Sequence, residues 1–237
     1  NDTITFRDGG VINDVTKFQN VSNVEFVQFA DVANTISLDT TKLNDVKLIG
    51  GATTDIFNYA IANFDAHDSI DDGGGNDTLL FTTAGTLTDA MLSSISNIEK
   101  IQLANGTNTV TVDVSNLEGG IATLYAGTSG TNTYNYSLSN LTSADKIVGS
   151  GASTTDIIQF LDAGTVADDT RFSGLSAIDQ VKLANGTNTF NIGTNEAQLS
   201  NVSIIGNSGI DTFVYTSAAL TDGIANAKLV GSGGNDI

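Results

Sequence analysis

The chain has 237 residues, with 9 Lys or Arg against 27 Asp or Glu, so its formal net charge at pH 7 is −18. This charge excludes nucleic acid and anionic membranes as partners, because both would repel the chain, and it favours bound cations. Hydrophobic residues make up 40% of the sequence, enough to form a core, and no 18-residue apolar run predicts membrane insertion. The chain contains no cysteine, which excludes disulfides, and its 25 glycines with no proline indicate one kind of turn used repeatedly.

Three long segments of the sequence resemble one another. Residues 97–109 and 177–189 share an acid, an alternating strand-like run and Leu-Ala-Asn-Gly-Thr-Asn-Thr, and residues 23–30 form a diverged copy. These copies define three super-repeats, over 1–75, 76–154 and 155–235. We therefore expect residues 1–237 to form one continuous repetitive segment of a longer chain.

Each super-repeat divides into three parts at an Asp or Asn that ends a turn and begins an apolar alternation. We call these residues the anchors, and the intervals between them recur in a long, short, short order. The anchors are Asp2, Asn34, Asp55, Asp77, Asn108, Asn132, Asp156, Asn188, Asp211 and Asp236.

Apolar residues follow the first nine anchors at fixed positions. The residues two and four places after each anchor are all apolar or aromatic, which predicts nine strands that point the same parity inward. Stacked coils of this length predict an all-β, parallel β-solenoid of about nine coils, with a helical turn within 88–95 in a long coil. The alternative is a β-sandwich of hairpins, which would need tight turns at a much closer spacing along the chain.

The turns before several anchors are rich in glycine. Residues 72–79 and 206–213 match the pattern G-G-x-G-x-D-x-U, and residues 231–236 begin another copy. The chain here resembles the RTX, or haemolysin-type calcium-binding, family, and its longer repeat is similar to those of bacterial S-layer proteins and large RTX adhesins. The resemblance implies a secreted protein of the bacterial cell surface that binds Ca²⁺ at these turns.

The same turns carry the candidate metal ligands, because glycine-rich backbone carbonyls with an Asp carboxylate suit a hard cation. If the anchors form one internal column, Asp55 next to Asp77 and Asp211 next to Asp236 place like charges about 5 Å apart and would need a cation. The alternative is that these acids are solvated turn formers. The candidate ligands are Asp55, Asp71, Asp72, Gly74, Asn76, Asp77, Asp156, Gly206, Ser208, Asp211, Gly231, Gly233 and Asp236.

A separate acidic run contains Asp65, Asp68, Asp71, Asp72 and Asp77, with His67 among them. It fits Ca²⁺ better than a transition metal because oxygen donors dominate. The alternative is a solvated loop without function.

Three function classes follow from the pattern. The sequence carries no catalytic motif, so we expect no enzyme activity. A second class is ligand binding: a column of outward-facing threonines could bind ice or cell-surface polysaccharide. The third class, which we favour, is a structural, Ca²⁺-stabilised segment of a bacterial surface layer or surface filament. We expect this segment to assemble with copies of itself or to continue into adjacent repeats. The alternative is the stalk or ligand-binding region of a secreted RTX adhesin. The column contains Thr3, Thr35, Thr78, Thr109, Thr133, Thr189 and Thr212, interrupted by Ile56 and Ile157.

Overall fold

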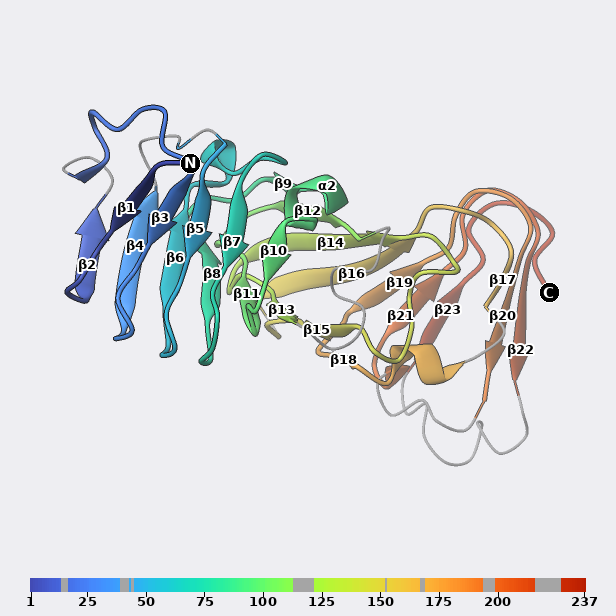
Figure 1. Ribbon diagram of the computed structural model, residues 1–237. Helices are drawn as coiled ribbons and strands as arrows, with labels where there is room; N and C mark the ends of the chain where they lie inside the picture. Colours follow the sequence, from blue (N-terminus) through green and yellow to red (C-terminus); the bar gives the residue numbers. More distant parts are fainter. Residues whose placement is uncertain are drawn as a thin grey trace.

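The computed structural model is an elongated stack of parallel strands, with the two chain termini at opposite ends (Figure 1). It describes residues 1–13, 17–38, 43, 45–112, 122–151, 153–166, 169–193, 199–215 and 227–237. Every strand pairing among these residues is parallel, and paired strands come from successive turns of the chain. The predicted all-β parallel β-solenoid is therefore confirmed.

The strands form four sheets, which we name A to D. Sheet A contains β1 (Thr3–Thr5), β3 (Phe26–Gln28), β5 (Lys47–Ile49), β7 (Ser69–Asp71) and β10 (Ile95–Ser96). Sheet B contains β2 (Gly10–Asn13), β4 (Asn34–Leu38), β6 (Ile56–Tyr59), β8 (Thr78–Phe81), β11 (Lys100–Gln102), β13 (Thr123–Tyr125), β15 (Lys146–Val148) and β18 (Leu175–Ser176).

The other two sheets belong to the later part of the chain. Sheet C contains β9 (Thr86–Leu87), β12 (Asn108–Thr111), β14 (Gly130–Tyr136), β16 (Thr154–Phe160), β19 (Gln180–Lys182), β21 (Ser203–Ile205) and β23 (Lys228–Val230). Sheet D contains β17 (Thr165–Val166), β20 (Asn188–Ile192) and β22 (Asp211–Tyr215). Among the elements whose bounds lie within the described residues, three are short helical segments: α2 (Asp89–Leu92), at the predicted helical turn, and the 3₁₀ turns η1 (Ile61–Asn63) and η2 (Asp169–Phe172).

The core lies between the sheets and is filled by the residues that the alternation places inward. Of the eighteen predicted inward positions, fourteen are buried. The remaining four are partly buried against the same core in the first and last anchor strands: Ile4, Phe6, Phe213 and Tyr215. Because side chains alternate across a strand, a single parity rule accounts for these eighteen positions. Residues outside the strands, such as Phe18, Phe64 and Phe172, complete the core.

The length of the turns differs from the prediction. The sequence separation of paired residues is nearly constant, as between β4 and β6 or between β13 and β15, and among the described pairs it is somewhat wider only between β15 and β18. The expected long coils are therefore wrong. Each long interval holds one ordinary turn plus one additional strand, so Thr78 pairs with Lys100, whereas Thr109 pairs with Thr86.

Because of this additional strand, each super-repeat alternates between a different pair of neighbouring sheets. The chain alternates between sheets A and B up to β8, between B and C from β11 to β16, and between C and D from β19 onward. The predicted single column of threonines is consequently wrong as well. Thr35 and Thr78 flank Ile56 in sheet B, whereas Thr109 and Thr133 lie in sheet C and Thr189 and Thr212 in sheet D.

Candidate metal centre

The anchors lie at the inner edge of the stacked turns, but they form four short columns instead of one. Asp77 is followed in its column by Glu99, not by Asn108, because the additional strand carries Asn108 to the next sheet. The columns are Asp2–Glu25; Asn34–Asp55–Asp77–Glu99; Asn108–Asn132–Asp156–Asp179; and Asn188–Asp211–Asp236.

Asparagine begins each of the last three columns and supplies the donor that the carboxylates lack. The Asn108 Nδ2 donates to Asn132 Oδ1 at 2.7 Å, and the Asn132 Nδ2 donates to Asp156 Oδ1 at 2.8 Å. The Asn188 Nδ2 reaches Asp211 Oδ1 at 2.7 Å in the same way. These contacts form ladders of side-chain amides that end on a carboxylate, and they give the buried acids Asp156 and Asp211 a hydrogen-bond donor.

The two predicted pairs of neighbouring acids are indeed adjacent. Asp77 Oδ1 accepts the backbone N–H of Asp55 at 2.8 Å, and Asp236 Oδ1 accepts that of Asp211 at 3.0 Å. Each carboxylate therefore contacts a backbone donor of the preceding anchor, which offsets much of the expected repulsion.

Asp156 and Asp211 are fully buried and fully partnered. Asp156 Oδ2 accepts the Ser150 backbone N–H at 3.0 Å and the Thr154 hydroxyl at 2.9 Å, while Oδ1 binds Asn132. Asp211 Oδ2 accepts the Asn207 backbone N–H at 3.1 Å, while Oδ1 binds Asn188. Neither carboxylate has an oxygen without a partner.

The predicted ligands around the last turns support the stacking of these turns. Gly206 donates its N–H to Val230 O at 2.7 Å, and Ser208 pairs with Gly233 in an isolated parallel bridge. A Cβ on Gly231 would lie 2.1 Å from Asp236 Oδ2, so this glycine is required where the backbone meets the carboxylate. Asp236 itself is exposed.

Asp72 differs from all these acids. Its side chain is 0% exposed, and neither of its carboxylate oxygens has a hydrogen-bond donor. Asp77 Oδ2 is also buried and has no hydrogen-bond partner. The buried hydroxyl of Thr53, on the stacked turn, has none either. Three acceptor oxygens of two carboxylates thus lack a donor within one pair of turns.

The electrostatics of this group follow from burial. Burial, with the negative charges of Asp77 and Asp55 next in importance, raises the pKa of Asp72 to about 9. Burial also raises the pKa of Asp77, and Glu99 and Asp55 add to the effect. Charged carboxylates in this setting require a proton or a cation, because buried charge without a partner is costly.

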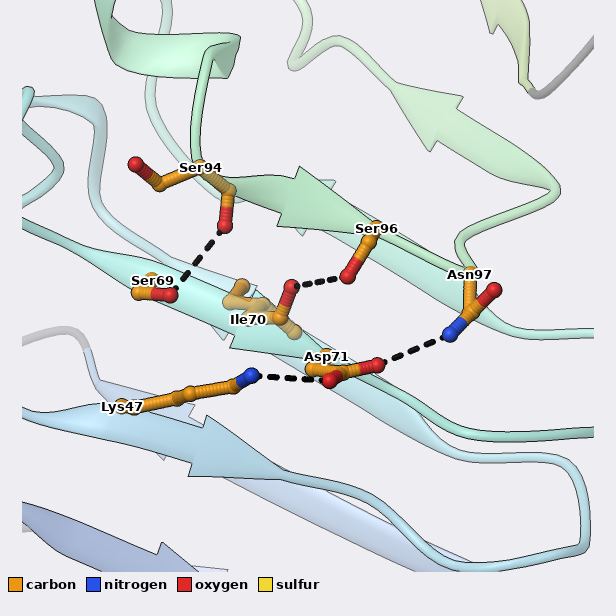
Figure 2. A network of polar contacts seen from close by, with 7 residues as sticks. All are labelled: Lys47, Ser69, Ile70, Asp71, Ser94, Ser96 and Asn97. Carbon is orange, nitrogen blue, oxygen red and sulfur yellow. Dashed lines mark hydrogen bonds and ion pairs between the residues drawn. The ribbon is translucent and has the colours of Figure 1, made fainter.

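Asp71, by contrast, points to the outer face of sheet A (Figure 2). One of its oxygens accepts from Lys47 Nζ at 2.8 Å and the other from Asn97 Nδ2 at 2.8 Å, and the nearby Lys47 lowers the pKa of Asp71. Strand alternation separates Asp71 from Asp72, so the structure does not bring these two predicted ligands together. Gly74 and Asn76 are exposed in the turn that follows.

The acidic run does not form one cluster. Asp65 accepts the backbone N–H of His67 at 2.8 Å, and Asp68 accepts that of Asp65 at 2.6 Å, so these residues close a turn among themselves. Asp72 and Asp77 instead belong to the next glycine-rich turn, together with Asp55 from the turn before.

The anchor prediction missed the acids that end the first three columns. Glu25, Glu99 and Asp179 each accept the backbone N–H of an anchor Asp on the preceding turn, with Asp77 N to Glu99 Oε2 at 2.8 Å and Asp156 N to Asp179 Oδ2 at 2.7 Å. Their signal was present in the repeated Asn-Val-Glu, Asn-Ile-Glu and Ala-Ile-Asp segments. Their place one full turn after an anchor Asp identifies them.

The described residues contain no convergent group of three or more His, Cys, Asp or Glu side chains suited to a metal. Ca²⁺ also accepts carbonyl, hydroxyl and water oxygens, so the three unpartnered oxygens of Asp72 and Asp77 in a glycine-rich turn still fit it. Over the same ranges, no helix is long and apolar enough to cross a membrane. Comparisons with protein-family models, curated proteins and solved structures found no match.

Proposed function

We propose that this segment is a Ca²⁺-stabilised structural rod of a secreted bacterial surface-layer or surface-filament protein. The observation that carries the proposal is the stacking itself: regular parallel turns with a filled core run from β1 to β23. A molecule built this way is long, regular and stiff, which suits a scaffold.

The surface and the buried acids support the same proposal. The outer strand positions are mostly small and polar, and polar ladders such as that of Figure 2 tie neighbouring turns together. Two open pockets, of about 470 and 400 Å³, lie on the first turns of the described chain, and neither includes an anchor. A net charge of −18 would be partly neutralised by divalent cations outside the cell.

Chelation of Ca²⁺ tests the proposal. We expect the melting temperature in excess EDTA to fall by roughly 5–10 °C relative to millimolar Ca²⁺, because a ligand present at about 100 times its Kd adds roughly 2.7 kcal/mol. Electron microscopy in Ca²⁺ should show sheets or filaments that disperse in EDTA. Unchanged melting and unchanged particles would reject the proposal, and isolated stalks in both conditions would favour the adhesin stalk.

A further inference from the structure

The turn that contains Asp72 departs from four other glycine-rich turns at one position. Where β5, β15, β21 and β23 lead into such a turn, the first residue after the strand is glycine. These residues are Gly50, Gly149, Gly206 and Gly231. After β7 the same place holds Asp72, so this turn carries a second buried acid in addition to its anchor Asp77.

The backbone of the neighbouring turn lies close to the Asp72 side chain. A Cβ on Gly50 would lie 1.5 Å from Asp72 Oδ1, so the carboxylate fills the space that glycine leaves open on the stacked turn. Gly75 has φ of +148°, and a Cβ there would lie 2.7 Å from Asp77 Oδ1 and 2.8 Å from Thr53 O. The tight backbone thus brings carboxylate and carbonyl oxygens close together.

No basic side chain among the described residues neutralises this group. Lys47, in the paired strand β5, forms an ion pair with Asp71 on the outer face. Asp55 has its two oxygens occupied by Asn34 and by the Gly51 backbone N–H. Both oxygens of Asp72 and one oxygen of Asp77 consequently remain as acceptors without a donor.

We propose that Asp72 makes the turn 72–77 a distinct divalent-cation site, in which Asp72 and Asp77 are the carboxylate ligands, while Asp156 and Asp211 bind no cation. Oxygen donors alone favour Ca²⁺ over transition metals, and the ligand number that Ca²⁺ requires would be completed by backbone, hydroxyl and water oxygens. This inference rests on the proposed Ca²⁺ dependence and narrows it to one turn.

Isothermal titration of the 237-residue chain with CaCl₂ tests the assignment, with MgCl₂ as the competing cation. Two variants remove the carboxylate: Asp72→Asn keeps its shape, and Asp72→Gly restores the residue of the four other turns. Asp71→Asn is the matched control, because it removes the same charge one residue away on the outer face. Asp211→Asn tests the alternative site, and circular dichroism checks the fold of each variant.

We expect one Ca²⁺ equivalent to disappear, or its affinity to fall at least 100-fold, in both Asp72 variants, and to remain in Asp71→Asn and Asp211→Asn. The melting temperature should rise with Ca²⁺ in the wild type but not in Asp72→Gly, and without Ca²⁺ Asp72→Asn should melt above the wild type.

Ca²⁺ binding that survives in both Asp72 variants but is lost in Asp211→Asn would overturn this inference and leave the Ca²⁺-stabilised rod standing. A wild type that neither binds nor responds to Ca²⁺ would overturn both, and would leave a bound proton to neutralise Asp72.

Discussion

At the scale of single residues, the exchange of Asn for Asp at an anchor determines which end of a column the residue occupies. An amide both donates and accepts, so Asn108 and Asn132 can pass hydrogen bonds along the stack, whereas a carboxylate only accepts. The last three columns accordingly run from Asn to Asp or Glu. The Asn anchors are the donors that stabilise the buried carboxylates of Asp55, Asp156 and Asp211.

Asn132→Asp tests this role. The change keeps the shape but replaces the donor to Asp156 Oδ1 with a second carboxylate at a fully buried position, so we expect about 3 kcal/mol of destabilisation. Asn135→Asp is the control, since it makes the same change on the outward side of β14 and should cost less than about 1 kcal/mol. Urea unfolding measures both, and equal losses would contradict the ladder.

Gly50→Ala tests the close approach of the turns. Its Cβ would lie 1.5 Å from Asp72 Oδ1 and 2.6 Å from Asp72 O, so we expect a loss of about 2 kcal/mol in unfolding free energy. Gly74→Ala is the matched control, because nothing lies within 4 Å of its Cβ and the change should stay within about 0.5 kcal/mol. If both variants melt like the wild type, the stacking of turns 50–55 and 72–77 is looser than described.

At the scale of elements, a short bend with a residue at positive φ precedes β3, β11 and β19. Asn23, Asn97 and Ala177 occupy the same place, two residues before a column-ending acid, with φ of 55°, 56° and 52°. Asparagine tolerates this left-handed conformation better than other residues with a side chain, whereas alanine is strained in it. The third copy of the bend is therefore built less favourably than the other two.

Ala177→Asn should relieve that strain. Residue 177 is exposed, so the amide meets no steric barrier, and we expect a gain of roughly 0.5–1 kcal/mol in unfolding free energy. Ala177→Val, which places a β-branched residue at positive φ, should instead destabilise the protein. Thermal melts of the two variants should move in opposite directions, and a shift in the same direction would argue against strain at this bend.

At the scale of the whole molecule, each super-repeat contains three turns and one additional strand. As a result, a sheet whose strands follow the glycine-rich turns in one super-repeat supplies the strands before the glycine-rich turns in the next super-repeat. Sheet B takes both positions: β8 follows the turn 72–77, whereas β15 precedes the turn that begins at Gly149. Features that recur once per super-repeat consequently do not stack on one sheet. This is why the threonines form short rows and offer no continuous binding face.

Deletion of whole and half turns tests this arrangement. Asn132 pairs with Asp156, so removal of residues 132–155 joins two matching positions and should leave a cooperatively folded rod that melts within a few degrees of the wild type. Removal of residues 132–143 breaks the register and should abolish cooperative melting. Circular dichroism distinguishes the two, and similar melting of both deletions would contradict the assigned register.

The fold class was predictable from the sequence because it depends on local alternation. Residues such as Phe57 and Tyr134 follow an anchor at the same distance, and a strand places them inward whatever lies above or below. The glycine-rich turns were equally visible, since tight turns require particular residues.

The stacking was not predictable in the same way, because it depends on which turn lies above which. Sequence intervals between anchors could not reveal that Asp77 meets Glu99 before Asn108, since the additional strand resembles any other. For the same reason, the sequence placed Asp71 and Asp72 together as ligands, whereas the strand sends one to Lys47 and buries the other without a donor. The amino-acid sequence by itself determined which strand positions point inward and which residues form the turns. Only the tertiary structure decided which acids share a column and which one lacks a hydrogen-bond donor, because these features depend on contacts between residues far apart in the chain.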